Sequence, residues 1–282
     1  MNYYFVICNI KIQIVSQYKI QWNKHIQNFL SQSFVNPDEY YECIWTDTLL
    51  PRGILIYSDT TQAIFKNGEY EERLHFFWGQ NIPCMLYREQ KDKKIIYLNN
   101  YYKETILSED NYCIFNALAF EKVLLKHYAV ILHSSFIIWK GEAILFTAPS
   151  GTGKSTQAAL WEKHEDAIIV NGDRAILKKK DDKVFAYGIP ICGSSNICLN
   201  AEAPLRAIVY LAQYPKNIVE KLNLNQKIKK LISETTINYY NRTSLEYALN
   251  LISDVAVQSN MYYFRCTKDS KSVGVLAATL EE

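Results

Sequence analysis

The sequence predicts a fold that mixes α and β structure, with a β-rich part over residues 1–110 and a part over residues 111–282 in which strands and helices alternate. Short apolar runs bounded by Gly, Pro, Asn or Asp fill the first part, as in half-buried strands. In the second part, an apolar run over 143–146 leads through a glycine-rich turn into an amphipathic run over 157–161. Apolar residues recur at helical spacing toward the C-terminus, and the length suits one large or two ordinary domains.

In the β-rich part, Ile10, Ile12 and Ile14 alternate with polar residues, which predicts a half-buried strand. Further strands are expected at five short apolar runs, over 54–57, 63–65, 75–78, 84–87 and 94–97. The Asn67-Gly68 pair is typical of a tight hairpin. These strands predict an antiparallel sheet, interrupted by helices around 22–29 and 38–43. No chemical constellation stands out, so we interpret this part as a scaffold or a substrate-docking domain.

The second part begins with a helical pattern over 111–128, with Asn111 as a candidate cap. Paired strands over 129–133 and 135–139 follow, and then the strand into the glycine-rich turn with its helix over 155–164. Further strands are expected over 167–170, 175–177, 184–187, 207–211 and 262–265, and further helices over 226–234, 245–259 and 270–280. The basic run 178–180 and the aspartates after it lie between apolar stretches and predict a solvated hairpin turn.

Charge and cysteine content exclude several classes of protein. The 31 Lys and Arg residues are spread along the chain with 29 Asp and Glu residues, so the net charge of +2 gives no reason to expect nucleic acid or a membrane as a partner. The seven cysteines form no Cys-x-x-Cys pair and no zinc-ligand spacing, which is typical of buried free thiols in a reducing cytosol. No run approaches the roughly 18 apolar residues of a membrane span, so we expect a cytoplasmic protein.

Residues 148–156 read Ala-Pro-Ser-Gly-Thr-Gly-Lys-Ser-Thr, between an expected strand and an expected helix. This is the context of a phosphate-binding loop, in which glycines such as Gly151 and Gly153 let backbone N–H groups turn toward a phosphate chain. Lys154 is placed to reach the β- and γ-phosphates, and the Ser155 hydroxyl to ligate Mg²⁺. The usual first glycine of the motif is replaced by Ala148. The expected nucleotide-binding residues are Ser150, Gly151, Thr152, Gly153, Lys154, Ser155 and Thr156.

Other candidate residues lie after neighbouring strands. Asp173 follows the strand after the loop helix, where a nucleotide-binding fold places an acidic residue for metal binding or proton acceptance; the alternative is a turn-forming Asp. His133 is a candidate catalytic residue or a structural hydrogen-bond donor. Arg174 is a candidate for neutralising a γ-phosphate or an anionic substrate, or a plain surface residue. Ser194 and Ser195 are candidates for a substrate pocket, although turn chemistry explains them equally well.

This order of residues resembles HPr kinase/phosphorylase and its related kinases, which share a core with ATP-dependent phosphoenolpyruvate carboxykinase. His133 stands 21 residues before Lys154, the loop is of the family's Ser-Gly-x-Gly-Lys-Ser type, and a strand then ends in an acidic motif. The segment 186–190 looks like the family's short glycine-containing strand. The resemblance covers about residues 125–210 and implies a kinase core of this type over 111–282. It is closer to relatives with a Gly-Asp-Arg motif and to the peptide-tailoring kinases of the group.

The chain departs from the family at two positions. Arg174 follows Asp173, where the family usually has a second aspartate, and Lys183 stands near the position of a glutamate. The bifunctional enzymes use these groups for metal binding and for the reverse, phosphorolytic reaction.

The resemblance implies an ATP-dependent phosphotransferase that uses ATP or GTP with Mg²⁺. Its acceptor would be a hydroxyl, with a serine of a peptide or small protein as the candidate. Asp173 would ligate the metal with Ser155 or act as the base, His133 would orient that base or the γ-phosphate, and Lys154 would neutralise the phosphates. HPr kinases assemble as hexamers, so the resemblance also leaves open that this chain forms a homo-oligomer.

Three alternatives remain on the sequence alone. The chain could be a nucleotide-binding regulatory ATPase without a phosphorylated acceptor. It could be a carboxykinase-like enzyme that acts on a small acid. It could also be a relative that binds nucleotide without turnover, an alternative that Ala148 and the single acidic residue keep open.

Overall fold

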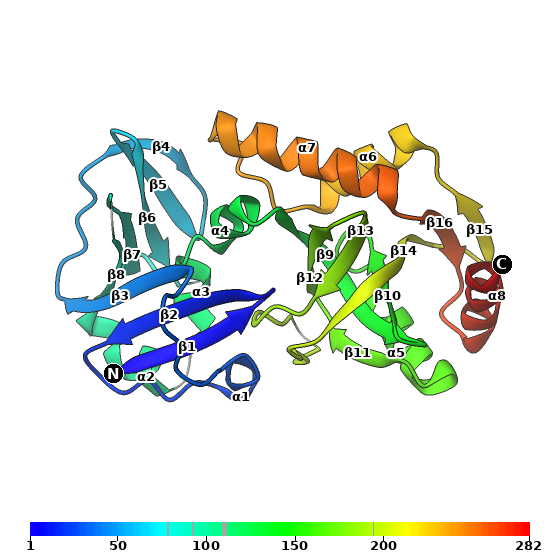
Figure 1. The fold of residues 1–282 in the computed structure, drawn as a ribbon, viewed down its shortest axis with the longest axis horizontal. Helices are drawn as coiled ribbons and strands as arrows, with labels where there is room; N and C mark the ends of the chain where they lie inside the picture. The colour runs from blue at the N-terminus through cyan, green and yellow to red at the C-terminus, as the bar shows by residue number, and fades with distance from the viewer. Residues whose placement is uncertain (78, 92, 109–111, 194) are drawn as a thin grey trace. The chain divides into compact units, whose positions relative to one another are not determined.

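The computed structural model describes residues 1–77, 79–91, 93–108, 112–193 and 195–282 (Figure 1). The chain forms two compact units, Met1–Val123 and Leu124–Glu282. Each unit is built on an eight-stranded sheet, and the described residues also form eight α-helices, so the fold is mixed α and β as the sequence predicts.

The division between the units falls after residue 123 instead of after residue 110, because residues just before it bond to the first sheet. The Tyr41 hydroxyl donates to the Leu118 carbonyl at 3.0 Å, and Arg73 pairs with Glu121 at 2.5 Å. Lys122 pairs with Glu89 at 2.7 Å.

The first unit contains a mixed sheet in the order β1-β2-β3-β8-β7-β6-β5-β4. Its strands are β1 (Asn2–Ile7), β2 (Ile10–Ser16), β3 (Glu39–Thr46), β4 (Ile54–Ser58), β5 (Gln62–Asn67), β6 (Tyr70–Phe76), β7 (Pro83–Glu89) and β8 (Lys94–Asn99). The expected all-antiparallel sheet is wrong in part, because β3 lies parallel to both β2 and β8. The expected hairpin at Asn67-Gly68 is confirmed, since it joins β5 to β6.

The expected helix over 38–43 is wrong. Glu39, Tyr41 and Cys43 are buried while Tyr40 is exposed, and this alternation with a period of two residues belongs to strand β3. The helix expected around 22–29 shrinks to the four residues of α1 (Lys24–Gln27), capped by the Asn23 side chain. Trp78, at the end of one expected strand, lies outside the described residues.

The helix expected over 111–128 is two helices, α3 (Tyr112–Ala117) and α4 (Phe120–Lys126). Ala119 separates them, because its φ of 51° is left-handed and ends a right-handed helix. The candidate cap Asn111 lies outside the described residues. The 3₁₀ helix η1 (Asn100–Tyr102) and helix α2 (Lys103–Ser108) precede this segment.

The second unit contains a sheet in the order β10-β9-β12-β13-β14-β16-β15, with β11 paired to β9 and a further pairing of β10 with β14. Its strands are β9 (Ala129–Trp139), β10 (Glu142–Thr147), β11 (Ile168–Asn171), β12 (Arg174–Lys180), β13 (Lys183–Tyr187), β14 (Glu202–Gln213), β15 (Ile218–Lys221) and β16 (Met261–Cys266). The expected strand pair at 129–139 is wrong, since β9 runs through His133 and Ser134 without a break. The expected hairpin is confirmed at Asp181-Asp182, which join β12 to β13, whereas the basic run 178–180 lies within β12 and not in the turn.

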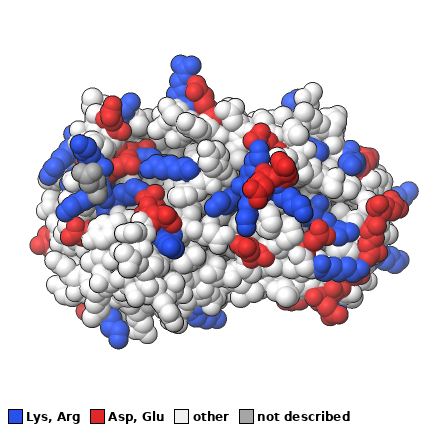
Figure 2. Space-filling view, in the orientation of Figure 1, with Lys and Arg blue, Asp and Glu red and all other residues white. Residues whose placement is uncertain are grey.

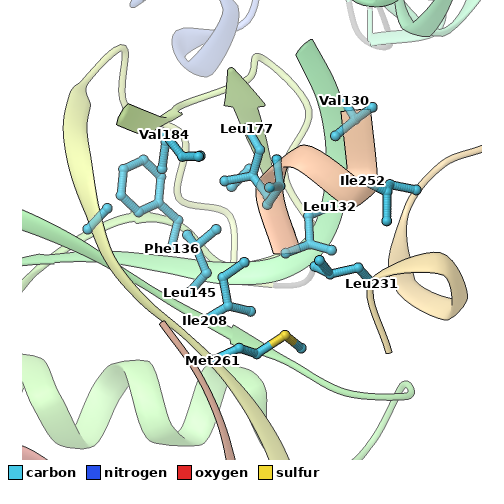
Figure 3. Close-up of a cluster of buried hydrophobic side chains, with 14 of the residues drawn as sticks. Val130, Leu132, Phe136, Leu145, Leu177, Val184, Ile208, Leu231, Ile252 and Met261 are labelled. Carbon is cyan, nitrogen blue, oxygen red and sulfur yellow. The ribbon is translucent and has the colours of Figure 1, made fainter. Parts of the chain in front are cut away.

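Helices cover two apolar sides of this second sheet. One core contains Leu132 and Phe136 of β9 with residues of α6 (Leu224–Glu234) and α7 (Arg242–Gln258), and Figure 3 shows part of it. The other core contains Ile137 and Trp139 with residues of α5 (Lys154–Glu165) and α8 (Ser270–Glu281). Both faces of the sheet are therefore buried under helices. This packing holds in place the strand ends that carry the candidate site.

Two further observations concern the surface and the helices. Acidic and basic side chains are interspersed over the face drawn in Figure 2. Among the described residues, no helix has the length and apolar character needed to cross a membrane.

Candidate phosphate-binding site

The candidate site lies at the carboxyl ends of parallel strands in the second unit. Strands β10 and β14 are parallel, with Thr147 opposite Tyr210, and β14 is also parallel to β16. The loop after β10 therefore emerges beside the end of β14, where the Gln213 amide donates to the Thr152 carbonyl at 3.1 Å. Residues 149–152 and 210–213 line an open pocket of about 490 Å³. Ligands of open α/β sheets bind at this end of the strands.

The loop has the backbone conformation that its glycines allow. Gly151 has a φ of 78° and Gly153 a φ of 122°, values that other residues rarely adopt. Ala148 is buried and keeps a negative φ, so the loop enters from β10 without needing the motif's usual first glycine.

The N-terminus of α5 lacks a side-chain cap. Its N-cap residue is Gly153, whereas the N-caps of α6, α7 and α8 are Asn223, Asn241 and Asp269, whose side chains each accept a backbone N–H. The first-turn N–H groups of α5, which include those of Ser155 and Thr156, thus have no side-chain acceptor at the cap. A helix end of this kind favours an anion.

The Lys154 side chain lies in the loop, largely buried. Its ammonium group donates to the Ala148 carbonyl at 2.8 Å, with the Pro149 carbonyl at 3.5 Å. Burial lowers the pKa of Lys154, while the carboxylates of Glu234 and Asp173 oppose that effect. The ammonium group therefore lies within electrostatic reach of both carboxylates.

His133 lies between two carboxylates. Its Nε2 is 3.5 Å from Oδ1 of Asp173, and its Nδ1 is 3.4 Å from Oε2 of Glu234. The hydrogen bond from His133 is the main cause that lowers the pKa of Asp173; Arg174 adds to the effect and burial opposes it. Asp173 is consequently an ionised carboxylate at neutral pH.

The Asn171 side chain builds the turn that carries Asp173. Its oxygen accepts the backbone N–H groups of Asp173 and Arg174 at 2.9 and 3.0 Å, and its nitrogen donates to the carbonyls of Ile189 and Ile191 at 3.1 and 3.0 Å. The Asn-Gly-Asp turn composition is the sequence signal for this role.

Glu234 is the site residue for which the sequence gives no signal. It ends α6, and the chain just after it bonds to β9 through the Thr236 N–H and the Ile131 carbonyl at 2.9 Å. This contact, between residues about a hundred positions apart, brings the Glu234 carboxylate to His133.

The remaining predicted residues lie around the same turn. Ser155 donates to the Gly172 carbonyl at 3.4 Å, and Arg174 donates through Nε to Oδ2 of Asp173 at 3.1 Å. A Cβ on Gly172 would lie 2.0 Å from the Ser195 hydroxyl oxygen and 2.4 Å from the Ser195 Cβ, so the Ser195 side chain leaves no room for a larger residue at position 172. Ser194 lies outside the described residues.

The donors at this turn would suit a metal ion only if a bound ligand supplied further oxygens. Among the described side chains, no group of three or more His, Cys, Asp or Glu is placed to bind a metal. The turn does offer the Asp173 carboxylate, and the Ser155 hydroxyl contacts the residue just before it. Mg²⁺ bound to nucleotide phosphates often takes only one or two protein ligands and fills the rest of its shell with water.

Comparison with known proteins gives a distant likeness among solved structures. The chain matches no family model, and no curated protein matches it significantly. Among solved structures, it is similar to the HPr(Ser) kinase/phosphatase from Coxiella burnetii, with a TM-score of 0.30 and 14% identity, over 53% of this chain and 87% of that one. At this TM-score the likeness assigns neither a fold nor an activity to this chain.

Proposed function

We propose that this protein is an ATP-dependent kinase that transfers the γ-phosphate to a hydroxyl group, with a serine of a peptide or small protein as the candidate acceptor. The observation that carries the proposal is the uncapped N-terminus of α5, entered through two glycines of positive φ and adjoined by the buried Lys154. An anion-binding helix end of this composition suits the phosphates of a nucleoside triphosphate.

The chain's own groups supply charge stabilisation, which is most of what phosphoryl transfer requires. The N–H groups of the loop and of the first turn of α5 would bind the β- and γ-phosphates. When nucleotide binds, the Lys154 ammonium group would break its contacts with the Ala148 and Pro149 carbonyls of the loop and neutralise phosphate charge instead. Mg²⁺, held by Ser155 together with the phosphates and water, would supply further charge neutralisation.

Asp173 would face the acceptor hydroxyl. Its lowered pKa makes it a weak base, so its main contribution is to orient that hydroxyl and accept its proton late in the transfer. His133 would hold the carboxylate in place through the 3.5 Å contact. Arg174 bonds the other carboxylate oxygen, where the resembling family usually has a second aspartate.

Phosphotransfer from γ-labelled ATP to a library of serine peptides tests this proposal. The wild-type chain should label peptides, and Asp173→Asn should lower the rate about 10²–10⁴-fold while nucleotide still binds. Asp182→Asn, at an exposed hairpin position, is the matched control and should transfer normally. If the wild-type chain releases free phosphate and labels no acceptor, the regulatory ATPase alternative is favoured.

A further inference from the structure

The two edges of the first unit's sheet differ. At the β1 edge, the Val6 N–H donates to the Phe29 carbonyl at 3.1 Å and the Ser31 N–H to the Tyr4 carbonyl at 2.8 Å. Residues 29–31 therefore cover that edge. At the other edge, β4 pairs with β5 alone among the described strands.

The first four side chains of β4 are aliphatic or aromatic and exposed. The exposed fractions are 79% for Ile54, 54% for Leu55, 41% for Ile56 and 40% for Tyr57. Successive side chains of a strand point to opposite faces, and the β4–β5 register is irregular only between Leu55 and Tyr57, so the exposed side chains of Ile54 and Leu55 leave both faces of β4 open. Natural sheets protect such edges with charges, prolines, β-bulges or a covering segment. Strand β4 has neither a charge nor a proline, and its register irregularity between Leu55 and Tyr57 leaves the apolar side chains exposed.

We infer that a second copy of this chain covers β4, with the two β4 strands paired antiparallel about a twofold axis. A strand is the occupant that uses both the open main-chain groups and the apolar side chains. Since the β1 edge is already covered, a second copy can extend the sheet only through β4. Pairing of β4 with itself closes the assembly of this sheet at a dimer, because the first unit's sheet then has no open edge.

The charges that flank β4 favour this antiparallel arrangement. Arg52 stands two residues before the strand and is exposed, and Asp59 follows it directly and is exposed as well. Antiparallel pairing places Arg52 of each copy near Asp59 of the other, so two opposite-charge contacts form. Parallel pairing would bring like charges together, which is unfavourable.

Sedimentation velocity of the 282-residue chain over a concentration series tests the inference. The wild-type chain should form a dimer as concentration rises, and Leu55→Lys should remain a monomer at the same concentrations. The Leu55 side chain is more than half exposed, so this variant should keep the wild-type melting temperature. Val257→Lys, at a 67% exposed aliphatic position on α7, is the matched control and should dimerise normally.

Charge variants and hydrogen exchange test the arrangement itself. Arg52→Glu should raise the dimer dissociation constant about tenfold, since two exposed contacts become repulsive. Asp59→Asn, which can still accept the N–H groups of Thr61 and Gln62, should raise it less. Amides of β4 should exchange more slowly as concentration rises. A wild-type chain that is monomeric throughout, or a dimer that Leu55→Lys leaves intact, would overturn the inference.

Discussion

The Glu234 carboxylate lies 3.4 Å from Nδ1 of His133, on the side of the ring opposite Asp173. An imidazole has two distinct nitrogens, and the group bonded to one of them fixes what the other presents. Glu234 is largely buried, so its carboxylate is held close to the ring. The contact thus sets the orientation in which the His133 ring faces Asp173.

Glu234→Gln should lower the phosphotransfer rate while leaving nucleotide affinity within about twofold. Loss of an orienting partner of this type typically costs 10–100-fold in activity. A comparison of kcat with KM for the nucleotide separates this role from a binding defect. Glu246→Gln, at an exposed position on α7, is the control and should behave as wild type. A Glu234→Gln protein with wild-type kcat would remove Glu234 from the site.

Gly153→Ala should destabilise the protein by about 1–3 kcal/mol, because a side chain at a φ of 122° is strained. It should also weaken nucleotide binding, since the first turn of α5 would shift. Gly274→Ala is the matched control, because Gly274 lies in helix α8 with open space at its Cβ position. That variant should stabilise the protein by up to about 1 kcal/mol. Urea unfolding measures whether each variant gains or loses free energy of unfolding. Equal changes in the two variants would contradict a strained backbone at Gly153.

The first unit should lose stability when the pH falls below about 6.5. Burial, aided by the charge of Arg73, lowers the pKa of His75 to about 4. Because the folded-state pKa lies below the unfolded value, the unfolded chain binds the proton first, and stability falls as the pH drops from about 6.5 to about 4. The loss should approach about 3 kcal/mol. Urea unfolding at several pH values should show a flatter profile for His75→Leu, and identical profiles would contradict the prediction.

Local signals in the sequence predict much of the fold. The strand, glycine-rich turn and helix over 142–165 follow from an apolar run, two glycines and an amphipathic pattern. The predicted elements are wrong where contacts between distant segments determine the secondary structure. The segment 38–43 becomes a strand because it pairs with β2 and β8, and β15 was not predicted, since its four residues pair with β16 far along the chain.

The candidate site likewise contains residues that local sequence patterns predict and a residue that they do not. The loop residues and Asp173 stand in recognisable local patterns, and the structure brings Asp173 to within 3.5 Å of His133. Glu234 has no such pattern, because only the packing of α6 and the bond from Thr236 to β9 place it beside His133. Sequence spacing cannot reveal a contact of that kind.

Nucleotide binding to the loop is the central claim, and a calorimetric titration of the full-length chain with Mg²⁺ and a non-hydrolysable ATP analogue tests it most directly. The wild-type chain should bind, and Lys154→Ala should lose at least about tenfold in affinity, since it removes a phosphate-neutralising charge. Lys163→Ala, an exposed lysine on the same helix, should bind as wild type. If the wild-type chain does not bind, or if both variants bind as tightly as it does, the site is not a nucleotide-binding loop.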